Sequence, residues 1–293
     1  MSPVARPAAA LAAAALTFNA FTWGVSWWPF RQLQAQGLHA LWATALIYAI
    51  AVLVLTLSRP AAWRELLRTP SLWVLVIASG TTNASFNWAV TIGDVVRVVL
   101  LFYLMPLWAV LLARALLGER LTAFAGARVT MALAGAAIVL WPAEGGGWPV
   151  PRSTAEWLGV LGGFSFALNN VMLRREAHRS DAARALAMFS GGTVVAGGLA
   201  AALAVQGVVP ALPAPAWGWT LPALALAAWF LAANLALQYG AARLPANATA
   251  VVMVSEVFFA SASAVALGAG TLDLRLVAGG ALIVGAALLA ARE

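Results

Sequence analysis

The chain has 293 residues, of which 63% are hydrophobic and 9% are charged, with a net charge of +7 and a mean hydropathy of +0.90. An ordinary soluble domain carries about 25% charged residues, so this composition excludes that class of protein. Apolar runs of about 20 residues recur along the chain and indicate a polytopic α-helical membrane protein. The sequence shows no series of the short alternating segments that build a transmembrane β-barrel.

The residue types also exclude several kinds of site. The sequence has no cysteine, and its two histidines, His39 and His178, have no partner at helical spacing. We therefore expect no disulfide, no thiolate nucleophile, no metal site and no cofactor. A GxxxxGK[ST] loop is also missing, so direct use of ATP is not indicated. Without an evident nucleophile and base pair, we expect that the chain is not an enzyme.

Five helices are expected in the first half of the chain. The first apolar run follows Arg6 and resembles a signal peptide. It continues through Phe18–Trp28, so we predict a retained first helix instead. The predicted ranges are residues 8–29, 38–57, 71–92, 95–117 and 122–141. The breaker residues between Pro142 and Pro151 then mark the midpoint of the chain.

Five more helices are expected after the midpoint. Ser153 and Glu156 form an S-x-x-E capping pattern where the first of them begins. The predicted ranges are residues 154–174, 182–206, 217–240, 246–268 and 273–291. Ten crossings place both termini on one side of the membrane, and 13 of the 17 arginines then lie at or near that side. This bias favours an N-in, C-in orientation, and it explains the basic composition without a nucleic-acid partner.

The two halves echo each other in sequence. The segment Phe21–Arg31 aligns with Phe164–Arg174, with aromatic, hydroxyl and arginine positions in register. Asn87 and Gly93 have the same spacing as Asn234 and Gly240. We therefore predict two five-helix repeats, residues 1–142 and 143–293. Because five is an odd number, the second repeat enters the membrane inverted, which is a recurrent transporter architecture with substrate bound near mid-membrane.

Two short motifs resemble those of the drug/metabolite transporter superfamily, in particular its EamA-type members. They are Trp23, Gly24, Ser26 and Arg31 in the first helix, and Pro106, Gly118, Glu119, Arg120 and Leu121 in and after the fourth. The Trp-rich and Asn-rich helices most resemble YddG-like exporters of aromatic amino acids. The resemblance implies export of amino acids and related metabolites across a bacterial inner membrane, through a central cavity and by alternating access.

Two residues at corresponding places in the halves are singled out. Glu256 lies near the middle of the predicted ninth helix, where an ionised carboxylate costs at least ~2.5 kcal/mol. It either binds a substrate ammonium or carries a proton, or it stays protonated and hydrogen-bonds a neighbouring helix. Pro106 interrupts the fourth helix at the matching place and is either a gating hinge or a purely structural kink.

Amides and aromatic side chains complete the predicted site. Amides in hydrocarbon need partners, so they either face substrate or join helices. Aromatic rings either stack on a flat or cationic substrate or face lipid. The candidate substrate-binding residues are Asn19, Trp23, Trp27, Asn83, Asn87, Tyr103, Phe164, Asn169, Trp229, Asn234, Gln238 and Glu256.

These features predict a secondary transporter of aromatic or hydrophobic amino acids and related small metabolites. The alternative that we keep open is an exporter of lipophilic cations or drugs, because a carboxylate among aromatic rings suits them equally well. The expected partners are the small-molecule substrate and the lipid bilayer. The sequence allows either a monomer or a homodimer.

Overall fold

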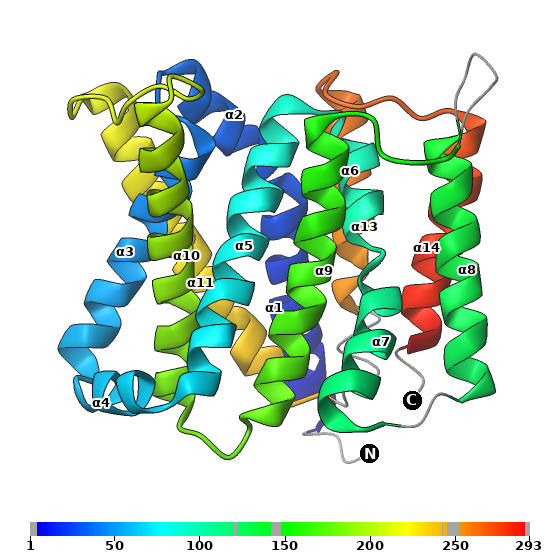
Figure 1. The fold of residues 1–293 in the computed structure, drawn as a ribbon, viewed down its shortest axis with the longest axis horizontal. Helices are drawn as coiled ribbons and strands as arrows, with labels where there is room; N and C mark the ends of the chain where they lie inside the picture. Colours follow the sequence, from blue (N-terminus) through cyan, green and yellow to red (C-terminus); the bar gives the residue numbers. More distant parts are fainter. Residues whose placement is uncertain (1–4, 120–121, 142–147, 242, 245–251, 291–293) are drawn as a thin grey trace.

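The computed structural model describes residues 5–119, 122–141, 148–241, 243–244 and 252–290, and these residues form helices and connections without any strand. The helices run side by side between two ends of the molecule (Figure 1). We call the end where α1 begins and α14 finishes the lower end, and the opposite end the upper end. The first apolar run is part of the bundle, because α1 packs against α11 and α13.

Eight helices make up the first half of the described chain. They are α1 (Ala5–Val25), α2 (Trp27–Ala35), α3 (Ala40–Ser58), α4 (Ala61–Arg68), α5 (Pro70–Ile92), α6 (Val95–Phe102), α7 (Met105–Leu117) and α8 (Ala123–Leu140). The predicted first and fourth helices are each divided in two, and the short helix α4 is additional. The other predicted ranges agree with the structure to within a few residues.

The second half contributes five described helices. They are α9 (Thr154–Arg175), α10 (Asp181–Val205), α11 (Trp217–Ala241), α13 (Ser255–Ala266) and α14 (Leu274–Ala290). The predicted capping box is confirmed, because the Ser153 side chain accepts a hydrogen bond from the Glu156 backbone N–H and the Glu156 carboxylate accepts one from the Ser153 N–H. The predicted ninth helix falls partly on residues 245–251, which lie outside the described part of the chain.

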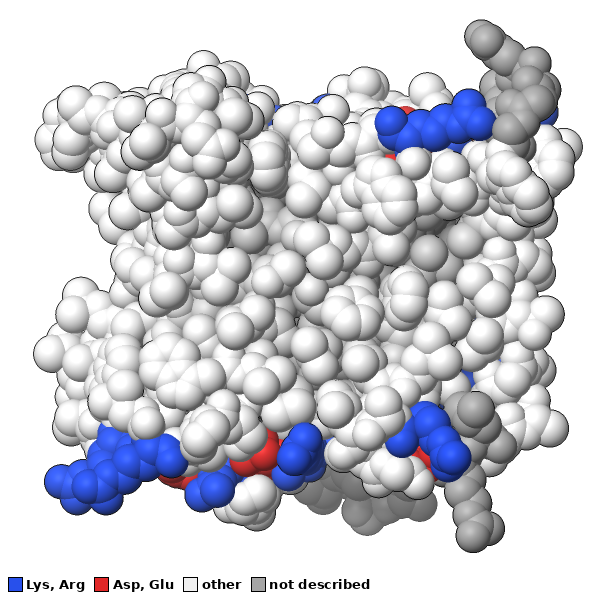
Figure 2. Space-filling model, viewed as in Figure 1, with Lys and Arg blue, Asp and Glu red and all other residues white. Residues whose placement is uncertain are grey.

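On the face drawn in Figure 2, the middle of the molecule is apolar and the charged side chains lie toward its two ends. They are spread along the lower end and gathered at the right of the upper end, with a white belt between them. Five helical segments have both the length and the hydropathy of a membrane span, and the apolar helices α13 and α14 are shorter. A belt of this kind is what the hydrocarbon core of a bilayer requires.

The contacts between helices follow the same pattern in the two halves of the chain. The last helix of the first half, α8, packs against the last helix of the second half, α14. The packing of α5 on α9 is matched by that of α11 on α1, and the packing of α6 and α7 on α9 is matched by that of α13 on α1. The predicted glycine correspondence has a physical counterpart. A Cβ on Gly93 would press on Ala155 at the start of α9, and one on Gly240 would press on Ala12 and Leu16 in α1.

Candidate functional site

Two interrupted helices meet in the middle of the bundle. The helix α6 ends at Phe102, Tyr103 and Leu104 form a turn, and α7 begins at Met105 with Pro106 as its second residue. Residues 252–253 are helical, Val254 lies in a turn, and α13 begins at Ser255 with Glu256 as its second residue. Pro106 and Glu256 therefore occupy the same position after the two breaks, as the sequence comparison predicts.

The two breaks are joined by a side-chain hydrogen bond. The Tyr103 hydroxyl donates to Oε2 of Glu256 over 3.2 Å. Tyr103 is only 3% exposed, and among the described residues no basic side chain forms an ion pair with Glu256. The expectation that Glu256 lies midway along an uninterrupted helix is corrected, because it lies in the first turn of α13. The backbone N–H groups of that turn favour a negative charge there.

Trp27 lies in the same core cluster as Tyr103 and contacts the helix that carries Glu256. Its indole N–H donates to the Ser263 hydroxyl on α13 over 2.9 Å, and it is 3% exposed. Close approach of α1 and α13 depends on Gly24, whose Cβ would lie 2.8 Å from the carbonyl oxygen of Glu256. Tyr103 therefore contacts Glu256 itself, whereas Trp27 contacts the same helix seven residues further along, at Ser263.

Three of the predicted amide side chains are buried, and each uses only part of its hydrogen-bonding capacity. Asn19 donates to the carbonyl oxygen of Ala233, and Asn87 donates to the Thr44 hydroxyl. Asn169 bonds its neighbour Asn170 at 3.5 Å. The side-chain oxygens of Asn19, Asn87 and Asn169 are buried without a hydrogen-bond partner. Asn19 and Asn87 thus join helices through their NH₂ groups while keeping an unused acceptor, which carries a free-energy cost.

The other predicted amides are placed differently. Asn83 accepts a short hydrogen bond of 2.5 Å from the Tyr48 hydroxyl and lies between α3 and α5, away from the α6–α13 crossing. Asn234 donates only to the carbonyl oxygen of Phe230 in its own helix. The side chain of Gln238 lies outside the part of the chain that the structure describes.

The remaining aromatic candidates form pairs between helices. Trp23 packs against Phe230 with ring centroids 4.7 Å apart, and Phe164 packs edge-on against Trp108 at 5.5 Å. Trp229 is 44% exposed, and its indole N–H bonds the Thr22 hydroxyl on α1. Its exposure on the apolar belt fits lipid contact.

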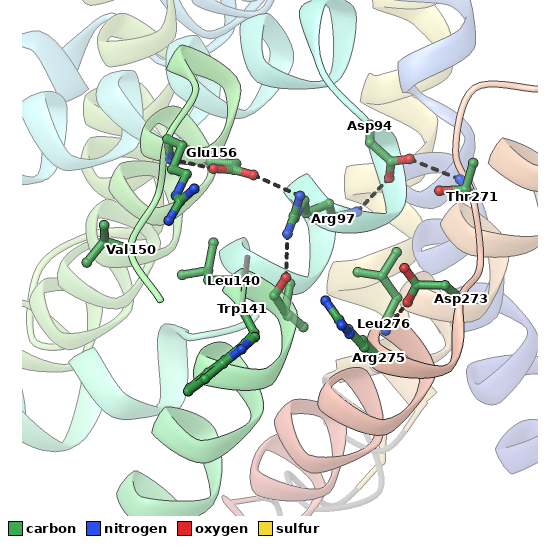
Figure 3. Close-up of a pocket in the computed structure, with 12 residues that line it drawn as sticks. Asp94, Arg97, Leu140, Trp141, Val150, Glu156, Thr271, Asp273, Arg275 and Leu276 are labelled. Atoms are coloured by element: carbon green, nitrogen blue, oxygen red, sulfur yellow. Dashed lines mark hydrogen bonds and ion pairs between the residues drawn. The ribbon is translucent and has the colours of Figure 1, made fainter. Parts of the chain in front are cut away.

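A second polar group, at the upper end, was not among the predicted site residues. Asp94 caps α6, and its carboxylate accepts from the backbone N–H groups of Arg97 and Thr271 (Figure 3). Arg97 forms an ion pair with Glu156 over 3.2 Å and donates to the carbonyl oxygen of Val139. These side chains line a cavity of about 300 Å³. The sequence signal was the capping pattern of Ser153 and Glu156, which indicates a helix start but not which other side chains lie beside it.

The Glu156 ion pair yields a prediction about stability. Changing Glu156 to Gln is expected to lower the free energy of unfolding by about 2 kcal/mol, because the side chain is only 10% exposed and Arg97 would lose its charged partner. Asp181→Asn is the matched control, since Asp181 is also in the first turn of a helix and paired with an arginine, but its side chain is 96% exposed. The control should change stability by less than about 1 kcal/mol. Thermal or denaturant unfolding of the detergent-solubilised protein measures both, and equal losses would contradict the prediction.

The apolar belt, the side-by-side helices and the interrupted helix pair define the class: the chain is a multi-pass α-helical membrane protein. Residues 10–141 match the model of the EamA-like transporter family. That agrees with the resemblance seen in the first-half motifs.

Two similar proteins extend the comparison. An uncharacterized transporter of Pseudomonas aeruginosa is 38% identical over 95 residues, which is 31% of this chain and 32% of the relative. The chain therefore matches about a third of the length of that protein. A crystal structure resembles the fold with a TM-score of 0.58 over 95% of this chain and 96% of the other, at 22% identity. This likeness covers both halves of the chain, and it shows similarity of fold alone.

Proposed function

We propose that the protein is a secondary transporter that binds its solute where α6–α7 crosses α13. The observation that carries the proposal is the Glu256 carboxylate, hydrogen-bonded to Tyr103 at the meeting of two interrupted helices. Membrane transporters commonly bind substrate at such interruptions, because freed backbone groups and helix ends face the solute there. The EamA-type match of residues 10–141 supports the same reading.

The chemistry around the crossing favours an amino acid with an aromatic or hydrophobic side chain. Glu256 offers a carboxylate to a substrate ammonium, and the ring of Trp27 and the apolar residues packed with it offer a surface to the side chain. This fits the resemblance to exporters of aromatic amino acids. Lipophilic cations are the second candidate, because Glu256 has no cationic partner among the described residues and cations bind aromatic faces.

The mechanism that we propose is alternating access by two inverted repeats, divided near residue 142. The matched contacts of α5 with α9 and of α11 with α1 support the symmetry. Pro106 follows the break in α6–α7 and is the proposed hinge of that repeat. The lower end carries the arginines of α4 and those around the α9–α10 connection, so we place it in the cytoplasm of a bacterial inner membrane, with export as the direction.

Solute flux in proteoliposomes tests the proposal. We expect saturable, counterflow-stimulated flux of tryptophan, weaker flux of threonine and little flux of a quaternary ammonium compound. Protein-free vesicles measure leakage. Flux of the quaternary ammonium compound without flux of either amino acid would replace the leading proposal by the second candidate. Flux that neither saturates nor responds to counter-solute would indicate a passive channel and overturn alternating access.

A further inference from the structure

The short helix α4 lies across the lower end of the bundle. Figure 1 shows it at the lower left, turned away from the direction of the long helices, where the chain passes from α3 to α5. Ala62 and Leu66 lie one turn apart and are buried in a core cluster together with residues of α5, α9 and α10. One face of α4 is therefore fixed to the bundle at the edge of the apolar belt. An amphipathic helix in such a place lies at the level of the lipid headgroups.

A second face of α4 is apolar and only partly covered by the protein. Trp63 and Leu67 also lie one turn apart, and the Trp63 indole N–H donates to the Thr56 hydroxyl on α3 over 2.9 Å. Leu67 is 62% exposed, and Leu57 near the end of α3 is 76% exposed. Since both leucines lie at the edge of the belt, contact with acyl chains removes this apolar surface from water.

A third face carries two arginines that no acidic side chain neutralises. Arg64 and Arg68 lie one turn apart and are exposed. Within the described part of the chain, neither guanidinium has an ion pair or a hydrogen-bond partner. Glu65 lies next to Arg64 in sequence but turns its carboxylate to Ser180, whose hydroxyl and backbone N–H donate to it over 2.6 and 3.2 Å. Figure 2 shows arginine side chains protruding at the lower left, where Figure 1 places α4.

The arginines around the α9–α10 connection, at the same end, are bound by acidic side chains. The pairs are Arg174 with Glu119, Arg179 with Glu176 and Arg184 with Asp181. Only α4 thus combines, among the described helices of the lower end, two uncommitted guanidinium groups with an exposed apolar face. Guanidinium groups bind phosphate oxygens through charge-assisted hydrogen bonds, and an apolar face beside them suits an acyl chain.

We propose that α4 is a binding site for an anionic phospholipid, whose phosphate lies at Arg64 and Arg68 and whose acyl chain lies over Leu67 and Leu57. A zwitterionic headgroup fits less well, because its ammonium finds no free carboxylate on α4. Basic residues next to a membrane span attract anionic lipid in the same way. Lipid binding here depends neither on the transported solute nor on the direction of transport.

Native mass spectrometry of the detergent-solubilised full chain, titrated with dioleoylphosphatidylglycerol, tests this site. We expect saturable binding that is at least about tenfold tighter than that of dioleoylphosphatidylcholine, which has the same chains. Arg64→Gln and Arg68→Gln should each weaken phosphatidylglycerol binding about fivefold, whereas Arg64→Lys should keep most of it because the charge stays. Arg174→Gln is the matched control, since Arg174 is exposed at the same end but paired with Glu119, and it should leave binding unchanged.

The other outcomes each overturn the proposal. Equal binding of the two lipids would reject recognition of the anionic headgroup. A loss in Arg174→Gln as large as that in Arg64→Gln would show a general basic surface without a site on α4. Full competition by inorganic phosphate would indicate a site for free anions instead of lipid. Leu67→Asn should also weaken phosphatidylglycerol binding, because Leu67 is 62% exposed and the change removes apolar surface without disturbing the core. Unchanged binding in that variant would reject the placement of the acyl chain.

Discussion

Replacing Glu256 by glutamine is expected to reduce tryptophan flux at least ~10-fold, because a hydrogen bond to a charged group contributes about 1.5–3 kcal/mol. Glutamine keeps the shape of the side chain and an oxygen that can accept from the Tyr103 hydroxyl, which lies 3.2 Å from the carboxylate. The substitution therefore removes charge and little else. The measurement is initial flux into proteoliposomes at several pH values, and the pH dependence should flatten in the variant.

Two further variants make the result specific. Glu65→Gln is the matched control, because Glu65 lies on α4 at the lower end and hydrogen bonds from Ser180 hold the pKa of its carboxyl below the ordinary value. It should leave flux unchanged. Tyr103→Phe removes only the hydroxyl that contacts Glu256 and should reduce flux less than Glu256→Gln does. Unchanged flux and unchanged pH dependence in Glu256→Gln, in protein that unfolds like the unaltered chain, would reject a role for this carboxylate.

The second large effect is expected at Gly191, where one added methyl group should strongly destabilise the bundle. A Cβ on Gly191 would overlap the carbonyl oxygen of Val76 and lie 2.9 Å from the backbone nitrogen of Gly80. These are backbone atoms of α5, so no side chain can rotate away. We expect Gly191→Ala to lower the free energy of unfolding by about 2–3 kcal/mol, in the range of overpacked cores.

The same helix provides a matched control for this prediction. A Cβ on Gly198 would meet nothing within 4 Å, and the residue is exposed on α10. Gly198→Ala should therefore raise stability slightly, by about 0.5–1 kcal/mol, because alanine loses less backbone entropy than glycine in a helix. Unfolding in mixed detergent micelles compares the two variants directly. If both alanines change stability in the same direction and amount, close packing of α5 on α10 is not what holds this interface.

The positions of the helices followed mainly from hydropathy and breakers. The ranges predicted for α3, α5, α8 and α9 are correct to within a few residues, because a helix in a bilayer must satisfy its own backbone and its length is set by the thickness of the hydrocarbon. The break in the first helix at Ser26 and the helix α4 were missed. A short interfacial helix of eight residues has too few positions for hydropathy to separate it from a loop.

The candidate site was predicted in part. The sequence comparison predicts that Pro106 and Glu256 correspond, and both prove to be the second residue after a helix break. The comparison could not reveal that Tyr103 reaches Glu256, since this contact joins residues 153 positions apart. Nor could it separate Asn83, which bonds Tyr48 on the far side of α5, from the residues at the crossing. Substrate contact for the predicted residues stays a prediction.

The sequence by itself determined the class of the protein and the ranges of several of its long helices. These properties depend on composition, periodicity and spacing, which are local and survive any rearrangement of the helices. Only the tertiary structure decided which polar groups meet. It joined Tyr103 to Glu256 at the crossing and gathered Asp94, Arg97 and Glu156 at the upper end, because those contacts depend on the angles and depths at which helices from different halves pack.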